Sequence, residues 1–142
     1  MLRSRDTGRA MSQENVEIVR KVYDGWGRSD PSQAFDYLDP EIVWEAIADA
    51  PDAGTYRGHS GVKRHMDDWL QDFEDFAFEC GQPVEVDGRL VLEQWWRNRG
   101  KGSGLKTEIH YAAVYTFRRG KVLAIKEYNT RAEALEAVGL SE

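Results

Sequence analysis

The stretch from Leu105 to Asn129 reads LKTEIHYAAVYTFRRGKVLAIKEYN and predicts two β-strands joined by a tight turn. Apolar and aromatic side chains recur at every second position, so that Tyr111, Ala113 and Tyr115 share one face of the first strand. Residues 118–120 form a connection too short for anything other than an antiparallel hairpin. The concentration of aromatic rings on one face indicates a concave wall that packs against other elements.

Two further β segments precede this hairpin, at residues 73–86 and 89–98. Asp87-Gly88 and the loop 100–104 connect the segments, and such short joints require antiparallel neighbours. One face of the second segment is expected to carry Leu90, Leu92, Gln94 and Trp96. Residues 131–140 predict a helical turn or two that ends at Gly139.

Three helices are predicted before the sheet. The first begins near Ser12, and its apolar stripe consists of Val16, Val19, Val22, Tyr23 and Trp26. A short second helix starts at Pro31 and ends before Asp39-Pro40, and a third spans residues 59–72. Between the second and third helices, residues 41–47 alternate as a strand, with Val43, Glu45 and Ile47 on one face and Ile42, Trp44 and Ala46 on the other.

Length and composition restrict the class of protein. With 142 residues, 41% of them hydrophobic and 31% charged, the chain predicts one globular domain, residues 12–142, after a disordered tail at residues 1–11. The net charge of −6 argues against nucleic acid as a partner, and no apolar run has the length of a membrane span. Cys80 is the only cysteine, so no intrachain disulfide forms and a reducing cytoplasm is expected.

Several phrases of the sequence resemble the nuclear transport factor 2-like superfamily, and within it the SnoaL-like branch of polyketide cyclase and ketosteroid isomerase-like proteins. The phrases are MSQENVEIVRKVYDGW, LDPEIVWEA, YRGHSGVKRHM and the run from Arg99 to Leu140. The resemblance implies a cystatin-like α+β fold, in which a cone-shaped, strongly curved antiparallel sheet packs on three N-terminal helices. It also implies an internal pocket for a small molecule and a homodimer. Because that superfamily contains isomerases, cyclases, hydrolases and members that only bind, it leaves open whether this chain is an enzyme.

Two carboxylates are the candidate catalytic groups. On the architecture that the resemblance implies, Glu45 looks inward and falls where similar isomerases carry their general base. Glu127 shares the parity of Leu123 and Ile125 and is the second candidate. Burial against apolar walls raises the pKa of a carboxyl group toward neutrality, where it exchanges protons readily. The alternatives are a hydrogen-bonded structural carboxylate at Glu45 and, at Glu127, an ion pair with Arg131 or Arg57.

The isomerase pattern is incomplete in this sequence. The second acid of that pattern falls on Ala113, and its tyrosine falls at about Val22, next to Tyr23. The departure favours either binding alone or a reaction that needs one carboxylate together with tyrosine or tryptophan donors. No metal and no cofactor are expected, because His59, His65 and His110 do not lie at a spacing that ligates a metal.

The predicted function is binding of a small, largely apolar organic molecule in the internal pocket, with cofactor-independent acid and base chemistry of the isomerase, cyclase or hydrolase type. The alternative function is non-catalytic binding of a small molecule or a role as a protein-interaction dimer module. For each aromatic residue taken singly, the alternative to ligand binding is ordinary packing in the core. The residues expected to line the pocket are Tyr23, Trp26, Tyr56, His59, Met66, Trp69, Gln94, Trp96, Tyr111, Tyr115 and Asn129.

Overall fold

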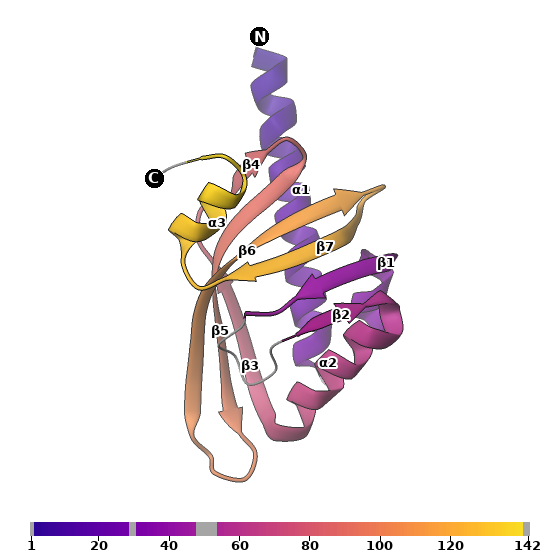
Figure 1. Cartoon of the computed structure of the whole chain (residues 1–142), viewed down its shortest axis with the longest axis vertical. Helices are drawn as coiled ribbons and strands as arrows, with labels where there is room; N and C mark the ends of the chain where they lie inside the picture. The colour runs from indigo at the N-terminus through magenta and orange to yellow at the C-terminus, as the bar shows by residue number, and fades with distance from the viewer. Residues whose placement is uncertain (1, 29–30, 48–53, 141–142) are drawn as a thin grey trace.

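A computed structural model describes residues 2–28, 31–47 and 54–140, with the backbone alone described at residues 2–12 and 31. Helices lie on both faces of one sheet (Figure 1). The helical elements are α1 (Leu2–Gly27), the 3₁₀ helix η1 (Pro31–Tyr37), α2 (Gly58–Asp72) and α3 (Arg131–Ala137). The strands are β1 (Leu38–Glu45), β2 (Thr55–Arg57), β3 (Phe73–Cys80), β4 (Val84–Val86), β5 (Arg89–Gly100), β6 (Lys106–Arg118) and β7 (Lys121–Tyr128).

The sheet has the strand order β2-β1-β7-β6-β5-β3, with β4 also paired to β5. Its neighbours are antiparallel except for β1 and β7, which run parallel. The predicted α+β class is confirmed, and the expectation of a wholly antiparallel sheet is corrected at this one pairing. The cause is the path of the chain: β1 enters from the helical layer through η1 and lies beside the last strand, so no hairpin sets its direction.

The three N-terminal helical elements cover one face of the sheet, called the inner face here, and α3 covers part of the opposite, outer face (Figure 1). The predicted stripe of α1 is buried on the inner face, since Val19, Val22, Tyr23 and Trp26 are each 3% exposed or less. Gly25, in the same helix, is needed for close packing. A Cβ at this position would lie 3.1 Å from the backbone nitrogen of Ala34 in η1.

The segment predicted as one strand at residues 73–86 is divided into β3 and β4. Gly81, Gln82 and Pro83 separate the two strands, and proline cannot donate to a strand ladder. The pairing of β3 with β5 also shifts register between Glu74 and Ala77, where Asp75 has a φ of 57°. A register shift of this kind is typical of a β-bulge, in which one strand carries an extra, unpaired residue.

The helix α1 extends back to Leu2 in the structure, through the segment predicted to be a disordered tail. The side chains of residues 1–12 lie outside the described residues. The boundary between tail and domain therefore stays a prediction.

A bidentate ion pair fixes the beginning of β1 to the end of β6. Arg118 donates from Nε to Oδ2 of Asp39 at 3.0 Å and from Nη2 to Oδ1 at 2.8 Å. The backbone nitrogen of Glu41 adds a third hydrogen bond to Oδ1 at 2.8 Å. The hydrogen bonds from Arg118 and then from Glu41 hold the pKa of Asp39 below its ordinary value.

Replacing Asp39 with Asn should therefore lower the Tm by several degrees at pH 7 and by much less in acid. A carboxyl group with a lowered folded pKa contributes stability above its ordinary pKa of 3.8, and that stability is lost as the pH falls through the folded value. Thermal melts of the wild type and D39N between pH 7 and 3 measure the difference. A gap in Tm that stays constant over this range would contradict the electrostatic role.

Candidate binding site on the inner face

The interior between the inner face and the helices is aromatic. Eight of the residues predicted to line a pocket come together there, and none is more than 7% exposed: Tyr23, Trp26, Met66, Trp69, Gln94, Trp96, Tyr111 and Tyr115. Their rings are in contact, with Tyr23 stacked on Phe78 at a centroid distance of 4.2 Å and Trp26 lying 5.2 Å from Trp96. The alternation along β5 and β6 therefore correctly predicted which of their side chains lie in this interior. The role of these side chains in ligand binding stays a prediction.

Four polar side chains form a connected island inside this aromatic interior, which we call the tyrosine network: Tyr23, Gln94, Tyr111 and Tyr115. The hydroxyl oxygens of Tyr23 and Tyr111 lie 3.1 Å apart, and Gln94 donates from Nε2 to the Tyr23 oxygen at 3.1 Å. Tyr115 donates to Oε1 of Gln94 at 2.5 Å. Every member is buried, so the hydrogen bonds replace contacts with water that folding removes.

Two hydrogen bonds of this network have a fixed direction. The proton of Tyr115 is committed to Gln94, and Gln94 donates onward to Tyr23. In the hydrogen bond between Tyr23 and Tyr111 either hydroxyl can be the donor. When Tyr23 donates, the Tyr111 hydroxyl proton is available for another acceptor. Tyr111 is also the most accessible of the three tyrosines, at 5% exposure against 1% for the other two. Donation along the chain polarises each following hydroxyl and strengthens the donor at its end.

Burial raises the pKa of all three tyrosines above the ordinary value, and the negative charge of Glu127 acts in the same direction. The hydroxyls therefore keep their protons at neutral pH. They can donate hydrogen bonds to a ligand oxygen, and they do not act as bases.

Glu127 faces the interior from β7, in agreement with the predicted parity. Its Oε2 accepts a hydrogen bond from Nε1 of Trp44 at 2.9 Å, and its Oε1 accepts one from the backbone nitrogen of Ile47 at 3.0 Å. Ala113, which lies between Tyr111 and Tyr115 on β6, pairs with Glu127 in the sheet. The carboxylate is thus held beside the tyrosine network by two N–H donors.

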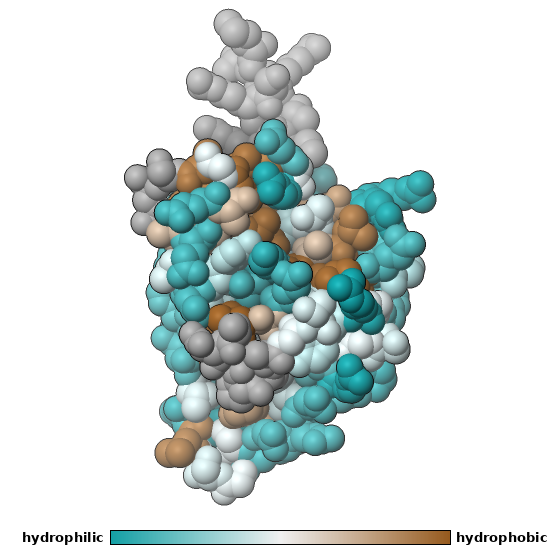
Figure 2. Space-filling view, viewed as in Figure 1, coloured by the Kyte–Doolittle hydropathy of each residue, from teal (hydrophilic) through white to brown (hydrophobic). Residues whose placement is uncertain are grey.

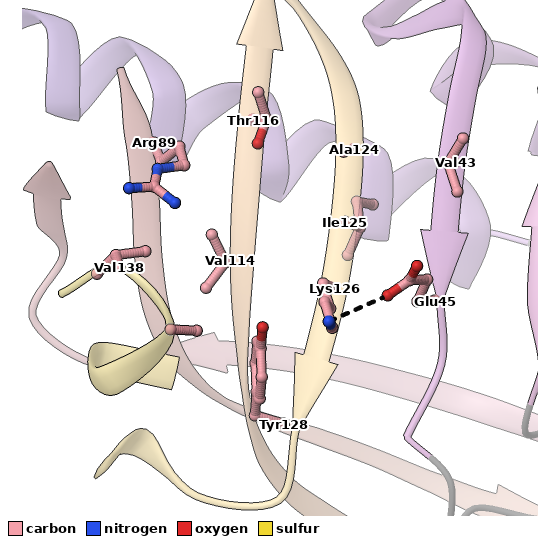
Figure 3. Close-up of a pocket in the computed structure, with 11 residues that line it drawn as sticks. Val43, Glu45, Arg89, Val114, Thr116, Ala124, Ile125, Lys126, Tyr128 and Val138 are labelled. Atoms are coloured by element: carbon pink, nitrogen blue, oxygen red, sulfur yellow. Dashed lines mark ion pairs between the residues drawn. The ribbon is translucent and has the colours of Figure 1, made fainter. Parts of the chain in front are cut away.

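The expectation that Glu45 looks inward is wrong. Ile42 and Trp44 are fully buried on the inner face, and Glu45 lies on the outer face with 43% of its side chain exposed. Its Oε2 lies 3.6 Å from Nζ of Lys126. The dashed line in Figure 3 marks this ion pair. A strand can turn only one set of alternate residues inward, and the pair Ile42 and Trp44 buries more apolar area than Val43 and Glu45.

Ile47 and Trp44 are both buried. In one regular strand they would point to opposite faces, because they are an odd number of positions apart. β1 ends at Glu45, so Ile47 follows the strand and its direction is independent of the parity of β1. The turn-rich segment at residues 48–53 that follows lies outside the described residues.

The outer face carries a groove of about 220 Å³ between β1 and α3. Its floor is apolar, and the charged side chains of Glu45, Arg89 and Lys126 stand at its edge (Figure 3). Figure 2 shows the same side of the molecule, where apolar surface lies among hydrophilic side chains. The groove is lined by Val43, Glu45, Arg89, Val114, Thr116, Ala124, Ile125, Lys126, Tyr128, Ala137 and Val138.

The remaining predicted residues lie at or outside the margin of the interior. Tyr56 is half-buried and stacks on His65 with ring centroids 4.4 Å apart. Nε2 of His59 is hydrogen-bonded to the backbone oxygen of Leu38 at 2.8 Å, which fixes the start of α2 to β1. Asn129 was expected to face inward, but it is exposed because β7 ends at Tyr128 and the alternation stops there.

Sequence reasoning missed Asn98, which is 3% exposed on the inner face of β5. The signal was present, since Asn98 continues the alternation of Gln94 and Trp96 by one more step. It was passed over because the predicted strand ended at this residue, whereas β5 continues to Gly100.

Comparisons with known proteins agree with this architecture. A family model described as a SnoaL-like domain matches residues 19–125, from the buried stripe of α1 to the middle of β7. The chain belongs to the SnoaL-like family. None of the curated proteins matches this SnoaL-like chain significantly.

Solved structures resemble the SnoaL-like chain over most of its length. An NTF2-like protein from Burkholderia xenovorans LB400 is 26% identical, with a TM-score of 0.68 over 89% of this chain and 96% of that one. A protein with a ketosteroid isomerase-like fold from Catenulispora acidiphila DSM 44928, in complex with trimethylamine, is 14% identical, with a TM-score of 0.69 over 87% and 93%. TerC, co-crystallised with polyporic acid, is 17% identical, with a TM-score of 0.66 over 88% and 97%.

Two features are absent from the part of the chain that the structure describes. No three histidine, cysteine, aspartate or glutamate side chains among them gather to hold a metal ion. No helix in the same part of the chain has the length and apolar character that crossing a membrane requires.

Proposed function

We propose that this SnoaL-like protein binds a small, largely apolar organic molecule against the inner face of the sheet, with a ligand oxygen accepting a hydrogen bond from Tyr111. The observation that carries this proposal is the buried tyrosine network, in which Tyr111 has the most accessible side chain of the three tyrosines. The surrounding rings of Trp26, Trp96 and Phe78 supply flat apolar surface of the kind that holds a planar ligand. Two of the structural neighbours hold small organic molecules, trimethylamine and polyporic acid.

Acid and base chemistry at the same place would use Glu127 as the base. A carboxylate beside a polarised hydroxyl donor provides the two groups that proton abstraction next to a carbonyl needs, one to take the proton and one to stabilise the oxyanion. Glu45 has no part in this arrangement, because its carboxylate lies on the other side of the sheet. Binding without turnover is the alternative, and it requires Tyr111 but not the Glu127 carboxylate.

A pair of probe molecules tests the binding proposal. 2-Acetylnaphthalene and 2-ethylnaphthalene have similar size and differ in the carbonyl oxygen that Tyr111 would bind. The wild type should bind the acetyl compound about tenfold more tightly, and Tyr111→Phe should remove this preference while both compounds still bind. Isothermal titration calorimetry measures both affinities.

The control for this experiment is Tyr37→Phe, which removes a hydroxyl from a tyrosine of η1 whose ring lies under Lys21. Its preference for the acetyl compound should equal that of the wild type. Equal affinities of the two compounds for the wild-type protein would contradict the role of Tyr111, and failure of both to bind would contradict an interior site.

We also propose that the protein forms a homodimer through the outer groove. Support comes from the apolar floor of the groove together with acidic and basic groups on its edge, a combination that a second copy can match by two-fold symmetry. Val114→Asp, in the floor, should convert a dimer to a monomer in sedimentation velocity experiments. A monomeric wild type at tens of micromolar concentration would contradict the dimer and leave the interior site unaffected.

A further inference from the structure

The outer groove contains a cation without an acidic partner in the described part of the chain. Arg89 is half-buried and lines the groove beside Val138 (Figure 3). No carboxylate, hydrogen-bond acceptor or aromatic ring among the described residues contacts its guanidinium. Lys126, the second cation of the groove, is already paired with Glu45. Because a charge that is withdrawn from water without a counter-charge costs free energy, Arg89 indicates an anionic group that comes from outside this part of the chain.

The strand pairing places Arg89 at one end of a row across the floor of the groove. Arg89 pairs with Thr116 on β6. Thr116 pairs in turn with Ala124 on β7, and Ala124 pairs with Val43 on β1. Since neighbouring strands lie about 4.8 Å apart, this row extends about 14 Å. An occupant of the groove therefore meets a positive charge at one end and uncharged side chains along the rest of the row.

The exposed face of α3 has the complementary pattern. The buried face consists of Ala134, Leu135 and Val138, which pack on the chain's own sheet. Glu136 and Leu140 are both exposed. Leu140 follows the helix, and its backbone nitrogen is held by the Leu135 oxygen at 2.9 Å. The side of α3 that faces away from the sheet thus presents one acid and one large apolar side chain.

Glu136 is the acid of α3 that is available to a partner. The side chain of Glu133 accepts a hydrogen bond from Thr130 at 3.3 Å at the start of the helix. Glu136 has no such contact among the described residues. Arg89 belongs to the sheet on which α3 packs, whereas Glu136 faces away from that sheet. The two charges are complementary, and the helix separates them within one chain.

The wall of the groove is suited to a second copy of the same helix. Ala137 lines the groove from α3 and is exposed. In a two-fold interface the same patch meets itself, so a second α3 in the groove brings its own Ala137 against this wall. The small alanine side chains allow the two helices to lie close together. The exposed face of each helix then covers the floor of the other copy's groove.

We propose that α3 of a second copy docks in the outer groove, with Glu136 of each copy paired to Arg89 of the other and Leu140 against the apolar floor. This inference rests on the proposed homodimer and names the element that forms it. The two-fold axis passes between the two helices and generates two identical ion pairs. Each otherwise unpaired charge receives its counter-charge, and the exposed leucine is covered.

Charge reversal tests this pairing. Arg89→Glu and Glu136→Arg each place like charges opposite one another twice in a dimer. Each change should therefore raise the Kd of the dimer about a hundredfold, which sedimentation velocity measures. The control is Lys101→Glu, which makes the same change of charge in the exposed loop between β5 and β6 and should leave the protein dimeric.

Mixing the two variants gives the sharpest result. In a mixed dimer of Arg89→Glu with Glu136→Arg, one contact joins the two altered residues with opposite charges and the other contact is native. The mixture should therefore dimerise with nearly the wild-type Kd, although each variant alone is monomeric. A chain that carries both changes should be dimeric as well. An ion pair within one chain cannot produce recovery on mixing, and recovery shows that both variants are folded.

The outcomes separate the two levels of inference. Single variants that stay dimeric, or a mixture and a double variant that both stay monomeric, would overturn the docking of α3 while the wild-type dimer stands. A monomeric wild type would overturn the homodimer itself and this inference with it.

Discussion

Above about pH 11 the free energy of unfolding should fall steeply, by about 1.4 kcal/mol per pH unit for each tyrosine of the network and about 4 kcal/mol for the three together. Burial raises the pKa of Tyr23, Tyr111 and Tyr115 above the ordinary value of 10.0. The folded chain therefore keeps protons that the unfolded chain releases above this pH. Stability from the three hydroxyls is complete below the ordinary pKa and is lost as the pH rises toward the folded values.

Denaturant titrations between pH 8 and 12, followed by circular dichroism, measure this slope. The absorbance of tyrosinate provides an independent test, because three of the six tyrosines should ionise only as the chain unfolds. Tyr115→Phe should make the slope shallower by the contribution of one tyrosine. Ionisation of all six tyrosines in a protein that is still folded would refute the buried network.

Glu127→Ala should destabilise the protein by about 3 kcal/mol, and Glu45→Ala by less than about 0.5 kcal/mol. Glu127 accepts hydrogen bonds from Nε1 of Trp44 and from the backbone nitrogen of Ile47, and its removal leaves two donors without their acceptor. Glu45 loses only an exposed ion pair with Lys126. The two variants form a matched pair, since they remove the same carboxylate from opposite faces of neighbouring strands.

Urea unfolding at pH 7 compares the two variants directly. If Glu45 were the inward carboxylate, the order of the two effects would be reversed. A small effect at both positions would show that the hydrogen bonds to Glu127 contribute little to the fold.

The fold was predictable from sequence wherever one pattern dominated. In β5 and β6 the largest apolar and aromatic side chains recur mainly at every second position, so one assignment of faces buries Leu92, Trp96 and Tyr115 together. The stripe of α1 is equally unambiguous. These elements supply the aromatic interior and the tyrosine network, and the residues that form them were named correctly from their periodicity.

The site was less predictable where apolar residues stand on both faces of a short strand. In β1 both alternating sets contain β-branched residues, and the choice depends on whether Trp44 finds an acceptor for its indole nitrogen. That acceptor is Glu127, which lies 83 residues away in sequence. Local periodicity does not reveal a contact between residues so far apart in the sequence. The sequence pattern alone therefore predicts the wrong face for Glu45.

The parallel pairing of β1 with β7 has a consequence for synthesis of the chain. β1 is complete once Glu45 has left the ribosome, but its sheet partner spans Lys121–Tyr128 and is made only after all the strands from β2 to β6. Until then Trp26 and Trp44 have no finished sheet to pack on, and contacts between such distant segments form slowly. The nascent chain should therefore remain sensitive to proteases and dependent on chaperones until β7 emerges, and acquire protection in a single late step.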